Sequence, residues 1–155
     1  MIKNATISPY HPSQFKVIEH IYNISKKDEF SNEGFDFNVV PLSQDKKALA
    51  SFETSNVYVA GSLPIEGFVG LDGNHISWLF VHPSARGKGV AKELVQHALK
   101  QIKGAVTLFV AKSNTAAINL YKSLGFEVLK ESVSKFQDKT IRILTMARYV
   151  DPSTV

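Results

Sequence analysis

The sequence is marked first by what it lacks. It has no cysteine, which excludes a disulfide scaffold, a thiolate metal site and a cysteine nucleophile. No apolar run approaches the roughly 20 residues that a membrane span needs. Residues 1–6 also lack the apolar stretch of a secretory signal. We therefore expect a soluble, cytoplasmic protein with no membrane partner.

The length and charge narrow the class further. A chain of 155 residues fits a single domain, 1–155, and the apolar content of 44% with 21% charged residues is typical of a globular protein. The net charge of +4 comes from basic residues spread along the chain, whereas a nucleic-acid interface usually has a clustered basic stripe. This favours a mildly basic surface or a phosphate-rich cofactor over nucleic acid. His11, His20 and His97 show no metal-ligand spacing, so we expect no metal.

The hydrophobic pattern switches repeatedly between the periods of strands and helices. Segments with strand character are 2–7, 56–61, 65–71, 75–81, 105–110, 126–136 and 140–149. Segments with helical character are 12–24, 43–53, 87–102 and 114–124. We expect Ser43 to cap the second helix, Gly104 to end the third, and residues 25–42 to be mostly loop. The order β-α-α-β-β-β-α-β-α-β-β predicts an α+β fold with a mixed, mostly antiparallel sheet flanked by helices.

A glycine-rich turn joins the apolar strand 75–81 to the amphipathic helix. Its sequence is Arg86-Gly87-Lys88-Gly89-Val90-Ala91. Glycines let backbone amides approach a ligand, and a helix start with free N–H groups attracts anions. A diphosphate would suit this turn. The Walker pattern fails because Val90 follows Gly89, and the dinucleotide fingerprint fails because Lys92 stands where a small residue is needed. A plain glycine-rich connection is the alternative.

The second notable segment begins at Asn114 and ends at Gly125-Phe126. Asn114 and Gly125 are good helix caps. Ala117 and Tyr121 lie one turn apart on the same face, where the small alanine admits a ligand and the tyrosine can donate a proton to a leaving thiolate. The alternative is that Tyr121 is an ordinary core aromatic.

Together the two segments resemble the Gcn5-related N-acetyltransferase (GNAT) superfamily. Arg86, Gly89 and Ala91 satisfy its [Q/R]-x-x-G-x-[G/A] diphosphate motif, and the Asn, Ala, Tyr and Gly-Phe residues of the second segment match its later motif in spacing. The likeness covers 56–149 in layout and about 76–126 in motif detail. It implies an acetyl-CoA-binding core at 56–149, while 1–55 corresponds to the variable acceptor side of the family.

The resemblance implies a role for each matching position. The strand end Leu79-Phe80-Val81 should separate from strand 105–110 and offer its backbone to pantetheine, with the N–H of Val81 stabilising the oxyanion. Residues Arg86 to Ala91 (Gly87, Lys88, Gly89 and Val90 between them) should hold the diphosphate. Asn114 and Ala117 should contact the pantetheine arm, and Tyr121 should protonate the leaving CoA thiolate. The amine would attack directly in a ternary complex.

The general base and the acceptor are less defined by the pattern. Family members often carry a Glu eleven residues before the motif's first Gln or Arg, and His75 occupies that position here. A histidine can accept a proton near pH 7, so His75 is the candidate base, with Asp72 and Glu66 as substitutes; an exposed turn histidine is the alternative. Acidic residues in 25–42 fit either a receptor for a cationic amine or a solvated loop: Asp28, Glu29, Glu33 and Asp36.

The sequence therefore predicts an acetyl-CoA-dependent N-acetyltransferase acting on a primary amine of a small molecule or a protein. Its partners would be acetyl-CoA and the amine, and a homodimer would be in keeping with the family. The alternative is a non-catalytic acyl-CoA-binding module on the same fold, against which the tyrosine argues because a pure binder needs no proton donor.

Overall fold

The computed structural model describes residues 6–151. The strands are β1 (Ile7–Pro9), β2 (Asn56–Gly61), β3 (Ile65–Asp72), β4 (His75–Val81), β5 (Gly104–Ala111), β6 (Glu127–Phe136) and β7 (Lys139–Val150). The α-helices are α1 (Phe15–Ser25), α2 (Lys46–Thr54), α3 (Val90–Lys100) and α4 (Thr115–Ser123). Short 3-10 helices are η1 (Pro12–Gln14), η2 (Lys26–Phe30), η3 (Leu42–Gln44) and η4 (Pro83–Ala85).

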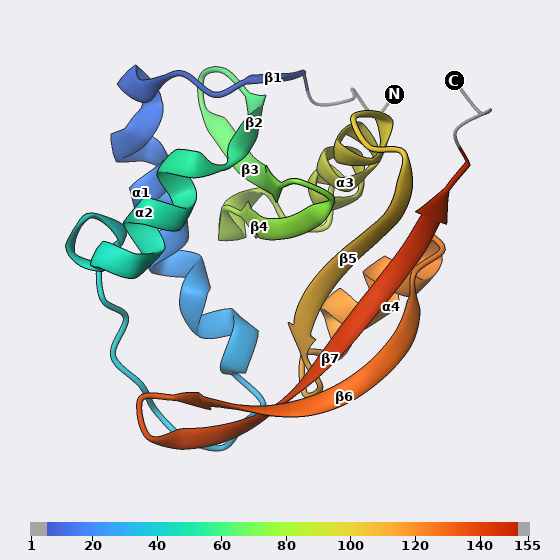
Figure 1. Ribbon diagram of the computed structural model, residues 1–155. Helices are drawn as coiled ribbons and strands as arrows, with labels where there is room; N and C mark the ends of the chain where they lie inside the picture. The colour runs from blue at the N-terminus through green and yellow to red at the C-terminus, as the bar shows by residue number, and fades with distance from the viewer. Residues whose placement is uncertain (1–5, 152–155) are drawn as a thin grey trace.

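The strands form one sheet in the order β1-β2-β3-β4-β5-β7-β6. Neighbouring strands are antiparallel except β4 and β5, so the expected α+β architecture with a mixed, mostly antiparallel sheet is confirmed. The parallel ladder joins β4 and β5 through two pairs, His75 with Thr107 and Ile76 with Leu108. Beyond these pairs the two strands diverge (Figure 1), as the resemblance to the GNAT superfamily implied.

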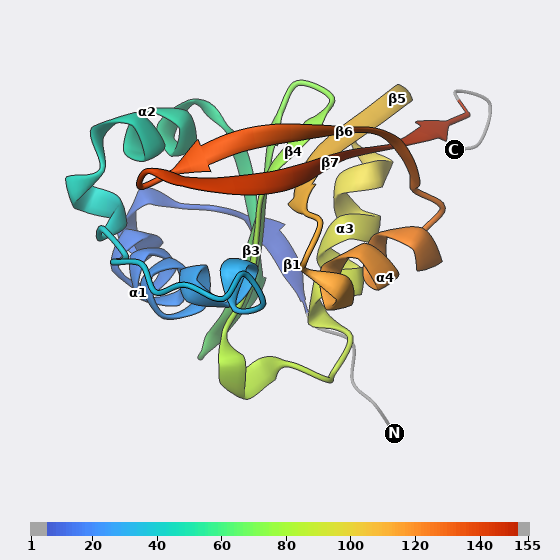
Figure 2. The same ribbon diagram turned by 90° about the horizontal axis from the view of Figure 1, so that it is seen from below.

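Helices cover both faces of the sheet. Viewed along the sheet, α1 and α2 lie on one side of β3 and β4, and α3 and α4 lie on the other (Figure 2). On the α3 side, Leu94, Val95 and Ala98 are fully buried because they repeat at helical spacing toward the sheet. On the α1 side, Ile18 and Ile21 are fully buried against a cluster that includes aromatic residues from α2, β3 and β4.

Several element boundaries differ from the sequence predictions. The first strand begins at Ile7, and the part predicted at 2–5 lies outside the described residues. The second helix begins after Asp45, whose carboxylate accepts from the Ala48 amide at 3.1 Å, so the prediction of Ser43 as the cap was wrong. Gly104 does not end α3 but begins β5 with a φ of 89°. Helix α3 starts at Val90, because Gly87 and Gly89 take positive φ.

The β6–β7 hairpin reaches the segment that follows η2. The side chain of Gln137, at the hairpin tip, accepts from the Asn38 amide at 3.2 Å and donates to the Asn38 carbonyl at 2.6 Å. This pair of bonds fixes the loop after η2 to the far end of the sheet (Figure 1). Among residues 6–151, no helix has the length and apolar character needed to cross a bilayer.

Candidate active site

A cavity of about 640 Å³ lies where β4 and β5 diverge. Its walls come from η2, the end of β4, the end of β5, the turn before α3 and helix α4. Eight residues predicted from the sequence line it: Leu79, Phe80, Val81, Arg86, Ala91, Asn114, Ala117 and Tyr121. The structure thus brings both motifs to one cavity. Five predicted residues are not among its lining: His75, Gly87, Lys88, Gly89 and Val90.

The end of β4 presents to this cavity backbone groups that are not bonded to β3. The His82 amide donates to the Glu66 carbonyl of β3 at 2.8 Å. Because such bonds alternate along an antiparallel ladder, the N–H and C=O of Val81 must point away from β3, toward the divergence. The carbonyl of Val81 indeed accepts a hydrogen bond from Ser25 Oγ of α1 at 3.3 Å. Its amide faces the same edge, where it can donate to a bound oxyanion.

The glycine turn before α3 has the backbone of an anion site. Gly87 and Gly89 have φ values of 77° and 80°, and a side chain at either would meet no atom within 4 Å. The first hydrogen bond of the helix runs from the Glu93 amide to the Gly89 carbonyl at 3.1 Å, so the amides of residues 90–92 precede it and face outward from the N-terminus. By contrast, the amide of Arg86 donates to the Pro83 carbonyl at 3.4 Å.

Helix α4 forms the opposite wall. Asn114 caps it as predicted, with Oδ1 accepting from the Ala117 amide at 3.3 Å, which leaves its Nδ2 available to a ligand. Tyr121 packs edge-on against Phe126, with 5.8 Å between ring centroids, and is 7% exposed. Burial raises the pKa of Tyr121, and the charge of Glu29 raises it further. The hydroxyl is therefore protonated at neutral pH.

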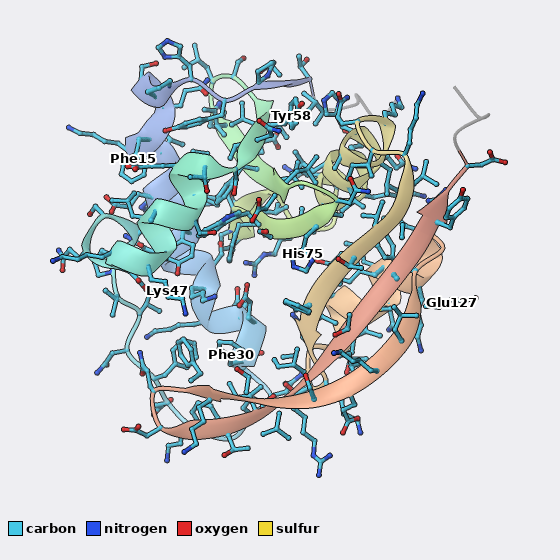
Figure 3. The ribbon with its side chains drawn as sticks, in the orientation of Figure 1. Phe15, Phe30, Lys47, Tyr58, His75 and Glu127 are labelled. Atoms are coloured by element: carbon cyan, nitrogen blue, oxygen red, sulfur yellow. The ribbon has the colours of Figure 1, made fainter. Side chains whose placement is uncertain are left out.

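His75 lies at the beginning of β4, outside the cavity. Figure 3 labels His75 on this strand. Its Nδ1 is 2.8 Å from Thr107 Oγ1, and its ring centroid is 4.5 Å from that of Phe109. Phe109 lines the cavity, so His75 contacts a residue of the cavity wall without lining the cavity itself. Burial lowers the pKa of His75, partly offset by the charge of Asp72. The imidazole is mostly neutral at pH 7, which a base requires, but a proton must travel through water to reach it.

The sequence did not predict that residues of α1 and η2 together form one wall of the site. Six residues of α1, η2 and the turn after η2 line the cavity: Ser25, Asp28, Glu29, Phe30, Ser31 and Asn32. The Asp28 carboxylate lies 2.5 Å from the Arg86 guanidinium, so η2 contacts the glycine turn directly. The acidic composition of this segment was visible in the sequence, whereas its placement depends on packing of α1 against β4.

Comparison with known proteins identifies the family. The model of the acetyltransferase (GNAT) family matches residues 9–126. This span is most of the chain and includes the end of β4, the glycine turn and helix α4. The chain therefore belongs to the GNAT family, and its seven-stranded sheet has the GNAT fold.

Individual relatives agree with this assignment. Peptidyl-lysine N-acetyltransferase YjaB of Salmonella typhimurium is 44% identical over 66 residues, which cover 43% of this chain and 45% of YjaB. The matched segment spans about half the length of the YjaB proteins. The solution structure of apo YjaB from Escherichia coli aligns with a TM-score of 0.70 at 26% identity, over 96% of this chain and 99% of that one. The yncA protein of Salmonella typhimurium, solved with its cofactor acetyl-CoA, has a TM-score of 0.72 at 18% identity, over 99% and 98%.

Proposed function

We propose that the protein transfers the acetyl group of acetyl-CoA to a primary amine. The observation that carries this proposal is the shared cavity. The end of β4, the glycine turn and Tyr121 of α4 all line or border it, and each has the chemistry that one part of acetyl-CoA needs. The amides before α3 suit the diphosphate, the β4 edge suits the pantetheine amides, and Tyr121 suits the sulfur.

The proposed reaction is a direct displacement. The lone pair of the amine nitrogen forms a bond to the thioester carbonyl carbon, and the carbonyl electrons move onto oxygen. The amide of Val81 donates a hydrogen bond to that oxyanion. When the carbonyl re-forms, the C–S bond breaks and the sulfur keeps its electron pair. The nitrogen loses one proton and the sulfur gains one, so the products are an N-acetyl amide and CoA thiol.

The raised pKa of Tyr121 refines its proposed role. An ordinary thiol has a pKa near 8.5, lower than that of this tyrosine, so full proton transfer from the hydroxyl to the thiolate is uphill. A hydrogen bond from the hydroxyl still stabilises the negative charge that develops on sulfur. Tyr121 would then act mainly as a hydrogen-bond donor to the leaving sulfur. The proton that the thiolate finally gains would come from the amine.

The amine must be neutral when it attacks. His75 stays our predicted base, acting through water over the ring of Phe109. For the acceptor we propose a lysine side chain or a similar alkyl amine, since the YjaB relatives are named for peptidyl-lysine. A cytoplasmic location and a homodimer also stay predictions.

Calorimetry with acetyl-CoA, followed by a free-thiol assay over a panel of amines, tests the proposal. We expect micromolar binding and thiol release with alkyl amines. Binding without thiol release for every amine would favour a non-catalytic acyl-CoA-binding module. Absence of binding would overturn the proposal itself.

A further inference from the structure

One carboxylate in the cavity wall has a charged partner held behind it. Glu29 of η2 lines the cavity, and its Oε2 accepts from Lys26 Nζ at 2.9 Å. Lys26 is not among the lining residues, and its side chain is 21% exposed against 34% for Glu29. The carboxylate therefore faces the cavity and the ammonium lies in the wall.

Aromatic rings fix the position of that lysine. Its Nζ lies 5.7 Å from the ring centroid of Tyr22, 5.6 Å from that of Phe30 and 5.8 Å from that of Phe80. Three rings around one ammonium restrict its rotamers and compensate part of its lost hydration. Glu29 is thus held by one oxygen, while its second oxygen can accept from a ligand in the cavity.

The other acidic residues of this segment have different surroundings. Asp28 pairs with Arg86 of the glycine turn, near the proposed diphosphate site. Glu33 accepts a hydrogen bond from Ser113 and is not among the residues lining the cavity. Glu29 and Tyr121 line the same cavity, and the charge of Glu29 adds to the rise in the pKa of Tyr121. Asp36 is exposed and is not among the lining residues, so Glu29 is the one of the four that lines the cavity without pairing with the glycine turn.

Building on the proposed acetyl transfer, we propose that Glu29 binds the ammonium group of the acceptor and selects cationic alkyl amines of the lysine type. A charge-assisted hydrogen bond to the free carboxylate oxygen would hold the ammonium in the cavity until the proposed base takes one of its protons, and the neutral amine would then attack the thioester. Lys26 keeps the carboxylate in this position. Acetylation removes the positive charge, so the product loses its attraction to Glu29 and can leave.

The test compares full-length wild type with Glu29→Gln and uses Nα-acetyl-lysine methylamide as the probe. Titration of the probe into the protein with bound CoA measures acceptor binding without chemistry. We expect Glu29→Gln to weaken this binding about tenfold or more, and to raise KM for the probe similarly, while the Kd of acetyl-CoA changes less than twofold. Glu33→Gln, on the same segment but outside the cavity, should change neither constant.

A second variant guards against misfolding. Glu29→Gln leaves Lys26 unpaired, so the double variant Lys26→Met/Glu29→Gln removes both charges and keeps the aliphatic packing. It should bind acetyl-CoA normally and still bind the probe weakly. Unchanged probe binding in either variant, or no binding of the probe to wild type, overturns the role of Glu29. If wild type binds the probe through Glu29 but releases no thiol, the proposed transfer fails and this inference stands.

Discussion

The guanidinium of Arg86 lies 2.5 Å from the carboxylate of Asp28, which links the turn before α3 to the 3-10 helix after α1. Both side chains are about half exposed, so the pair is weak by itself. The contact matters because Arg86 is the first residue of the motif assigned to the diphosphate. An anion bound at the turn must compete with Asp28 for this arginine.

Asp28→Asn is therefore expected to tighten acetyl-CoA binding. A surface ion pair contributes about 0.2–1 kcal/mol, which corresponds to a gain of roughly 1.5- to 5-fold. Calorimetry at low salt measures the effect, and the difference from wild type should shrink at high salt because exposed charges are screened. Asp36→Asn, an exposed position on the same segment, serves as the control. Weaker binding in Asp28→Asn would show that Asp28 supports the site.

Tyr121→Phe should lower kcat by about 10- to 100-fold and leave the Kd of acetyl-CoA within about twofold. The ring would still fill its buried position against Phe126, but the hydrogen bond to the leaving sulfur would be lost. Steady-state kinetics and calorimetry separate the two effects. Tyr58→Phe, in β2 beside His97, is a control away from the cavity. Equal losses of turnover and affinity would argue against a role at the sulfur.

Gly89→Ala should weaken acetyl-CoA binding about three- to tenfold. A side chain at this position meets open space, so the effect comes from a φ of 80°, which costs about 1–2 kcal/mol for an L-residue and shifts the amides at the start of α3. Gly73→Ala carries a similar strain at φ 59°, in the β3–β4 hairpin at the opposite end of β4. It should lose stability but keep its affinity. Similar affinities in the two variants would remove the turn from the binding site.

Ser25→Ala should lower kcat about three- to tenfold. Its hydroxyl is buried and bonds the Val81 carbonyl, and its loss frees the strand end that carries the proposed oxyanion donor. Ser55→Ala removes a serine-to-carbonyl bond of 2.7 Å at the end of α2, away from the cavity, and is the control. Full activity in Ser25→Ala, with the expected stability loss of about 1 kcal/mol, would mean that the bond is structural alone.

His75→Gln tests the base through the pH dependence of kcat/KM. A base works when neutral, and burial lowers the pKa of His75 below its ordinary value of 6.5. Wild-type activity should therefore level off toward neutral pH and fall on the acidic side as the imidazole gains a proton. The variant should be slower and lack that fall. An acidic limb that persists unchanged in His75→Gln would assign it to another group.

The local parts of the fold could be predicted from the sequence because local rules decide them. Strand β2 has its predicted bounds because turn residues flank an apolar run, and β4 likewise because the hairpin turn and Pro83 limit it. Cap choice was less certain, since Ser43 and Asp45 are both good caps and the 3-10 turn η3 decided between them. The motif glycines were visible, but the start of α3 after them, at Val90 in place of residue 87, was not.

The acceptor wall could not be predicted because it depends on contacts distant in sequence. The bond between Ser25 and Val81 joins residues 56 positions apart, and no periodic pattern marks either partner. The prediction of His75 as the base rests on its spacing from Arg86 along the chain. Between these two residues β4 carries a bulge, because its pairing with β3 steps from Ile76 to Trp78 and leaves Ser77 unpaired. A bulge changes which face the side chains on its two sides occupy, and spacing alone does not reveal it.

The two-pair ladder between β4 and β5 has a mechanical consequence. It divides the sheet into two halves, β1-β2-β3-β4 and β5-β7-β6. Most ladder pairs lie within one half or the other, and on the β4 side the two halves meet at His75 and Ile76. A molecule bound in the divergence would bridge strands that otherwise have few bonds to each other. Its binding free energy would then add to the cohesion between the halves, and its release would leave their relative angle free to change.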